Sequence, residues 1–253
     1  MSPNRRLLLQ AVATVVTLLT VFLVLGRVLG RAEAPLVAAD QAVQGPVLLV
    51  PGYGGSTDAL EVLATSLRAS GLTATVLQVP GDGTGDLGLS VAVLDAAAET
   101  SAVPVDVVGY SAGGVVARAW AKDHPSRVRR VVTLGSPHHG TSIAAIGAVF
   151  APGACPVACQ QLVPDSELLD GLNGDDETPA GPQWLSLWTT QDETVTPPVS
   201  ARLEGAVNVE LQRVCAGLQV THSDLPRHPV VTRIVQAALA GPGIAPPGPE
   251  VCS

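Results

Sequence analysis

The sequence predicts an α/β fold in which a mostly parallel sheet has helices on both faces. Short apolar runs, of the kind that form buried parallel strands, recur along the chain; segments with helical composition separate them; and glycine-rich turns follow several of the runs. Strands that alternate with helices form parallel sheets, because each connection must cross the sheet before the next strand begins.

The first half of the chain follows this alternation closely. The apolar run at 46–51 (PVLLVP) leads into the turn-prone PGYGGST, which is typical of a buried strand followed by a loop. The elements expected next are a helix at 58–68, a strand near 73–78, a glycine-rich loop at 80–86, a helix at 87–99, a strand at 105–108, a helix at 112–122 and a strand at 128–134.

The second half is less regular. From 135 to 181 the alternation stops, and the segment is expected to form either a cap or a long crossover loop. It holds too little apolar helix for a large lid, so we expect a compact core with a small lid or none. Strands near 184–189 and 206–211 and a last helix around 230–239 complete the expected fold.

Length and charge limit the domain count and the partners. With 253 residues, 47% of them hydrophobic, the chain can bury one sizeable core, so we expect a single domain at 40–253 that acts as a monomer. This domain has 10 basic against 21 acidic side chains, a net charge of −11. Such a surface repels phosphate groups, so nucleic acid is not an expected partner.

The N-terminal segment, residues 1–39, has the pattern of a targeting sequence. Arginines flank an apolar run at 7–25. The run exceeds the ~7–15 residues of a signal-peptide core and approaches the ~20 that span a bilayer, so an uncleaved membrane anchor is favoured over a cleaved signal peptide. In either case the domain is expected outside the cytoplasm, membrane-anchored or secreted.

Four cysteines, an even number in a chain with an export signal, indicate disulfides rather than free thiols. Three pairings are possible. We favour Cys155–Cys159 as a local link and Cys215–Cys252 as a link that holds the Pro/Gly-rich tail against the domain. A metal site is less expected, because no histidine stands at ligand spacing beside these cysteines.

The stretch VDVVGYSAGG at 105–114 indicates a nucleophile. Gly109-Tyr110-Ser111-Ala112-Gly113 matches the G-x-S-x-G pattern, with an apolar strand before it and a helix-forming segment after it. In this motif the serine sits on a sharp turn at the end of a strand, and the glycines avoid crowding the neighbouring strand and helix. The N–H of Ala112, at the start of the helix, is a candidate oxyanion donor.

A serine nucleophile needs a histidine base and a carboxylate that orients it, and in this arrangement both follow the serine in the order carboxylate, then histidine. Asp192 comes first after the strand LSLWTT and is preferred to its neighbour Glu193. His222, on a loop after the last strand, is preferred to His228, which is expected to begin the last helix. His138 and His139 precede any late carboxylate and are expected to be structural or to line a pocket.

The second oxyanion donor is expected in the loop PGYGGS at 51–56, because that loop follows the first long strand. The backbone N–H of Tyr53 is the candidate.

With these residues the chain resembles α/β-hydrolases of the bacterial lipase type and is similar to the small class 2 triacylglycerol lipases and esterases. The stretches that carry the resemblance, between residues 48 and 226, are LLVPGYGGS, VVGYSAGG, TLGSPHHGT, LWTTQDETVTPP and VTHSDLP. The family often has a histidine in its first oxyanion loop, and Tyr53 departs from that pattern.

The resemblance implies the α/β-hydrolase fold and cleavage of carboxylic ester or lipid substrates by Ser111, Asp192 and His222, with backbone donors at Tyr53 and Ala112 and no cofactor. Two alternatives stay open. One is an acyltransferase that passes the acyl group to an alcohol of the cell envelope, and the other is an anchored binding domain without catalysis.

Overall fold

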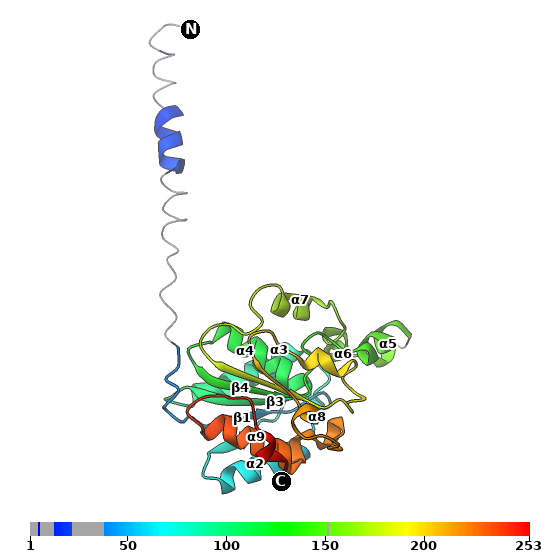
Figure 1. Cartoon of the computed structure of the whole chain (residues 1–253). Helices are drawn as coiled ribbons and strands as arrows, with labels where there is room; N and C mark the ends of the chain where they lie inside the picture. The colour runs from blue at the N-terminus through cyan, green and yellow to red at the C-terminus, as the bar shows by residue number, and fades with distance from the viewer. Residues whose placement is uncertain (1–4, 6–12, 22–37, 151) are drawn as a thin grey trace. The chain divides into compact units, whose positions relative to one another are not determined.

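Six strands of the described chain form one parallel sheet in the order β2-β1-β3-β4-β5-β6, and Figure 1 labels three of them, β1, β3 and β4. The computed structural model describes residue 5 and residues 13–21, 38–150 and 152–253. The strands are β1 (Val47–Val50), β2 (Ala74–Val76), β3 (Val105–Tyr110), β4 (Val128–Leu134), β5 (Gln183–Trp188) and β6 (Val207–Glu210). The predicted α/β fold with a mostly parallel sheet is confirmed.

Side chains of alternate strand residues enter two separate cores. Val47 and Leu49 of β1 belong to the core under α2 (Asp58–Ala69) and α9 (Pro229–Ala240). Leu48 and Val50 belong to the core under α3 (Leu87–Glu99) and α4 (Ala112–Asp123). Because successive side chains of a strand point to opposite faces, a strand buried on both faces needs the continuous apolar run seen in the sequence.

The segment between β4 and β5 contains short helices rather than one long loop. These are α5 (Ser142–Phe150), the 3₁₀ helix η1 (Pro152–Ala154), α6 (Val157–Gln161) and α7 (Glu167–Asn173). Buried residues of α5, α6 and α7 join the core that contains α3 and α4. The helices therefore pack on that face of the sheet.

A buried arginine holds the end of this segment to α4. The Arg118 guanidinium donates hydrogen bonds to Glu177 O (2.9 Å), Leu172 O (2.8 Å) and Asn173 Oδ1 (2.6 Å). Burial lowers the pKa of Arg118 to about 10, so the side chain stays charged at neutral pH. One of these acceptors, Leu172 O, belongs to the last turn of α7, where backbone carbonyls lack partners within the helix.

Two arginines of β4 contact the last turn of α9. Arg129 pairs with buried Asp106 (2.5 Å) and also donates to Leu239 O (2.8 Å). Arg130 donates to Gly241 O at 2.7 Å and to Ala238 O. Cations near helix C-terminal carbonyls are stabilising, so these contacts fix α9 against the sheet.

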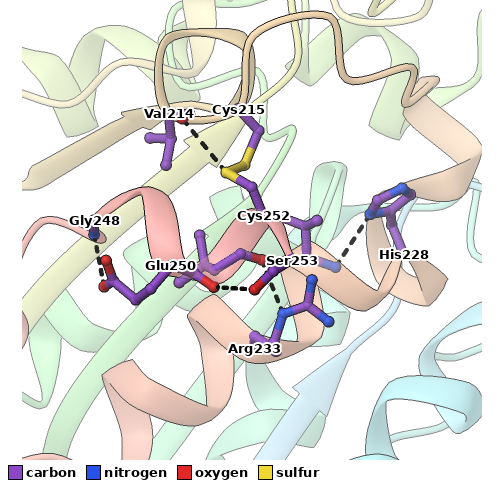
Figure 2. The surroundings of a disulfide bond; sticks show 10 residues. Val214, Cys215, His228, Arg233, Gly248, Glu250, Cys252 and Ser253 are labelled. Carbon is purple, nitrogen blue, oxygen red and sulfur yellow. Dashed lines mark hydrogen bonds between the residues drawn. A yellow bond between two sulfur atoms is a disulfide. The ribbon is translucent and has the colours of Figure 1, made fainter.

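Both predicted disulfides are present. Cys155–Cys159 links the end of η1 to α6. Cys215–Cys252 links the residue after α8 (Leu211–Val214) to η4 (Pro249–Cys252) and so holds the C-terminal tail against the domain (Figure 2). Arg233 of α9 adds a second hold on the tail through a hydrogen bond to Val251 O (2.9 Å).

Residues 1–36 form a unit separate from 37–253. Within that unit residues 13–21 are helical, and the rest of the expected targeting segment lies largely outside the described residues. No helix in the described part of the chain is long and apolar enough to cross a membrane.

Candidate active site

Ser111 lies on the turn between β3 and α4, with φ 54° and ψ −127°. A positive φ at a residue other than glycine is strained and persists only where the surrounding packing imposes it. The close packing around the flanking glycines explains why this conformation is imposed on Ser111. A Cβ on Gly109 would lie 2.4 Å from Gly113 O, and one on Gly113 would lie 2.2 Å from Val50 O. The chain can follow this turn only because helix and strands meet without side chains.

The structure brings Ser111, His222 and Asp192 together. His222 Nε2 lies 3.1 Å from Ser111 Oγ, and His222 Nδ1 lies 2.6 Å from Asp192 Oδ2. A carboxylate can only accept, so Nδ1 carries the proton and Nε2 is free to accept from the serine hydroxyl. The three residues are 8%, 8% and 4% exposed, so water competes little for these hydrogen bonds.

Asp192 is oriented by the backbone that follows it. Its Oδ1 accepts the N–H groups of Thr194 (2.9 Å) and Val195 (2.7 Å), which leaves Oδ2 for His222. The two alternative residues considered from the sequence, Glu193 and His228, take no part in these hydrogen bonds. Glu193 is exposed, and His228 accepts the Val230 N–H at the start of α9.

Two residues that the sequence did not single out also contact this group. The Tyr110 ring packs against that of His222 with centroids 5.1 Å apart, and its hydroxyl donates to His222 O (3.3 Å). Burial, and then the charge of Asp192, raises the Tyr110 pKa to about 12, which keeps the hydroxyl a donor. Gly135, at φ 55°, is the second: a Cβ there would lie 3.2 Å from both His222 Nδ1 and Asp192 Oδ2.

The two candidate oxyanion donors belong to residues near Ser111. Ala112 is the first residue of α4, so its N–H lies at the helix N-terminus. Tyr53 follows Gly52, and a Cβ added to Gly52 would lie 2.8 Å from Ser111 Cβ. Neither N–H donates to another residue within the described chain. The loop that carries Tyr53 is held by a hydrogen bond from Gly54 N–H to Gly83 O (3.3 Å).

A pocket of about 280 Å³ opens beside Ser111. Tyr53, with its side chain half exposed, lines one side of it. The segment at 135–181 supplies most of the remaining lining, largely with small or apolar residues: Pro137, Thr141, Ile143, Ala144, Gly147, Ala154, Cys159 and Leu162. The helices between β4 and β5 therefore shape the space next to the serine.

The two consecutive histidines contact other side chains of the fold. His138 is fully buried, with Nε2 3.1 Å from Thr133 Oγ1, and His139 Nε2 lies 2.7 Å from Glu177 Oε1. Neither belongs to the pocket lining. Burial, followed by the charge of Arg118, holds the pKa of His138 well below 6.5, so this ring is neutral in the fold.

Buried His138 gives a prediction for stability. The unfolded chain binds a proton at this histidine near pH 6.5 and the folded chain does not, so stability falls as pH drops below about 6.5, by at most about 1.4 kcal/mol per pH unit. We expect the unfolding free energy of His138→Asn, followed by urea titration from pH 7.5 to 5, to fall less steeply than that of the wild type. Parallel curves for the two proteins would show that His138 does not contribute.

Within the described residues, no group of three or more His, Cys, Asp or Glu side chains is placed to hold a metal ion.

Comparison with known proteins supports the fold. A family model described as the α/β-hydrolase fold matches residues 45–153. A triacylglycerol lipase of Burkholderia plantarii is 32% identical over 127 residues, which cover 45% of this chain and 36% of the lipase. One from Pseudarthrobacter phenanthrenivorans is 31% identical over 115 residues, 41% of this chain and 36% of the lipase. The chain thus matches little more than a third of the length of these curated relatives.

Solved structures match over more of the chain. The mature lipase BlEst2 of Bacillus licheniformis has a TM-score of 0.60 at 18% identity and covers 82% of this chain and 94% of its own. A monoacylglycerol lipase of Paleococcus ferrophilus has a TM-score of 0.56 at 16% identity and covers 79% of this chain and 95% of its own. The chain therefore has the α/β-hydrolase fold and is similar to lipases and esterases built on it.

Proposed function

We propose that the protein is a serine hydrolase that cleaves carboxylic esters. The observation that carries the proposal is the continuous hydrogen-bonded series from Ser111 through His222 to Asp192, buried beside an apolar pocket. Its similarity to triacylglycerol lipases supports an ester or lipid substrate.

In this mechanism His222 Nε2 takes the proton of the Ser111 hydroxyl as Oγ attacks the ester carbonyl carbon. The N–H groups of Ala112 and Tyr53 stabilise the negative oxygen of the tetrahedral intermediate. His222 then gives its proton to the leaving alcohol, which leaves an acyl group on Ser111. A water molecule, deprotonated by His222, releases the acid and restores the serine.

The location of the domain is a second part of the proposal. All four cysteines are paired in the two disulfides. Disulfides persist in oxidising compartments and are rare in the cytosol, so we place the domain outside the cytoplasm, secreted or held by its N-terminal segment.

The proposal is tested on the purified full chain with p-nitrophenyl butyrate and an active-serine phosphonate probe. We expect turnover by the wild type and loss of kcat by about 10⁵-fold or more in Ser111→Ala, together with loss of labelling. Ser223→Ala is the matched control, because this exposed serine directly follows His222 and takes no part in the mechanism. Absence of turnover and of labelling in all three proteins would leave a binding domain as the better interpretation, and equal turnover by all three would show that Ser111 is not the nucleophile.

A further inference from the structure

The Cys155–Cys159 disulfide lies at the pocket beside Ser111. Cys159 is one of the lining residues, and so is Gly147 of α5. A Cβ on Gly147 would lie 3.7 Å from Cys159 Sγ and 3.9 Å from Cys155 Cβ, which is ordinary contact distance. Helix α5 therefore faces the disulfide across a position where the sequence has no side chain.

The helix that carries Cys159 is fixed from its other side. Ala158 N–H donates to Thr84 O (3.1 Å), and the Gln161 side chain accepts Leu87 N–H (2.8 Å) while donating to Asp86 Oδ1 (2.8 Å). These contacts attach α6 to the loop at 80–86, the same loop that supports the backbone around Tyr53 through Gly83. The disulfide thus joins η1 to a helix that is already anchored close to the proposed oxyanion donors.

The volume of the pocket limits the chain that can fill it. Its volume of about 280 Å³ places this pocket at the lower end of the ~300–1,000 Å³ range of small-molecule sites, so it suits a short or medium acyl chain better than a long one. The small and apolar residues that line the space suit such a chain and offer no charged group to an acyl substituent.

We propose that this pocket binds the acyl group of a short- to medium-chain ester, and that Gly147 and the Cys155–Cys159 disulfide determine the longest chain accepted. The inference rests on the proposed ester hydrolysis at Ser111 and adds its substrate class. Gly147 leaves space between α5 and the disulfide, and the disulfide keeps the end of η1 from moving away from α6.

The test compares kcat/KM of the full chain for p-nitrophenyl butyrate, octanoate and palmitate. We expect the wild type to hydrolyse butyrate and octanoate and to discriminate against palmitate by at least about 10-fold, as expected for methylenes that extend beyond the pocket. In Gly147→Leu the added side chain occupies the space beside the disulfide. The ratio of octanoate to butyrate hydrolysis should therefore fall at least about 10-fold.

Gly153→Leu is the matched control, because Gly153 is exposed and a Cβ there meets nothing within 4 Å; its chain-length profile should equal that of the wild type. If Gly147→Leu does not fold, Gly147→Ala replaces it, since a Cβ there stays at ordinary contact distance. The double variant Cys155→Ser/Cys159→Ser should shift the preference toward palmitate, because the end of η1 is then no longer linked to α6.

The outcomes separate the two proposals. The assignment of the pocket is overturned if the protein hydrolyses butyrate but its chain-length profile is unchanged in Gly147→Leu (or Gly147→Ala) and in Cys155→Ser/Cys159→Ser. The proposed ester hydrolysis would stand in that case. Rapid hydrolysis of palmitate by the wild type overturns it as well. Absence of any ester hydrolysis, with no phosphonate labelling of Ser111, overturns the proposed function itself.

Discussion

Replacing Asp192 with asparagine is expected to lower kcat for an ester substrate by about 10⁴-fold while the fold remains intact. Oδ1 of Asp192 accepts two backbone N–H groups, so the amide oxygen of an asparagine must take that place. The amide NH₂ then faces His222 Nδ1. The amide NH₂ and a protonated Nδ1 are both donors and cannot form a hydrogen bond, so the imidazole carries its proton on Nε2 instead. A protonated Nε2 can no longer accept the proton of Ser111.

Glu193→Gln is the control for this experiment, because Glu193 is the exposed neighbour of Asp192 and changes by the same isosteric replacement. We expect it to keep the activity of the wild type. Steady-state kinetics with p-nitrophenyl butyrate, beside thermal unfolding of each variant, separates lost chemistry from lost folding. If Glu193→Gln were inactive and Asp192→Asn active, the roles of the two carboxylates would be reversed.

Much of the fold could be predicted because the sheet is buried on both faces. The helix at 87–99 and the strand at 128–134 have the bounds that the sequence indicates. Strand β3 instead continues through Gly109 to Tyr110, two residues beyond its expected end. Glycine weakens a strand on its own, so the local pattern ends at Val108, yet the approach of α4 requires a residue without Cβ at that point.

The segment at 135–181 could not be resolved from the sequence for a related reason. Its helices are short, and they contact distant residues: Arg118 on α4 donates to Leu172 O of α7, and Thr84 O in the loop before α3 accepts the Ala158 N–H of α6. Helices of this length are marginal without tertiary packing, so they leave little periodic signal.

The candidate site divides in the same way. Ser111, Asp192 and His222 could be predicted because their chemistry fixes both residue type and order along the chain. Tyr110 and Gly135 could not. A tyrosine before the serine fits the motif as well as many other residues, and Gly135 matters because of the space that His222 and Asp192 occupy.

Gly113→Ala is expected to destabilise the protein by about 3 kcal/mol, as overpacking of a closed core does. In a helix, alanine is favoured over glycine by up to about 1 kcal/mol, so helix propensity alone predicts the opposite sign. The new Cβ, however, would lie 2.2 Å from Val50 O and 2.5 Å from Pro51 O. These are backbone atoms, so α4 and the end of β1 must separate.

That separation should also reach the chemistry, because Pro51 leads directly into the loop that carries Tyr53. A misplacement of about 1 Å can cost about 100-fold in rate, so we expect kcat of the folded fraction to fall by about that factor. Gly171→Ala is the matched control: Gly171 is exposed on α7, and a Cβ there meets nothing within 4 Å. Urea unfolding should show a gain of up to about 1 kcal/mol for Gly171→Ala, with unchanged kcat.

If Gly113→Ala were as stable and as active as Gly171→Ala, α4 and β1 would tolerate a side chain between them. Ser111 would then not depend on the close contact of helix and strand for its position. A destabilised variant with normal kcat would separate the two effects, since it would show that the strand end yields while the loop with Tyr53 keeps its place. Loss of both is the result expected if a single steric constraint sets the fold of the turn and the geometry of its serine.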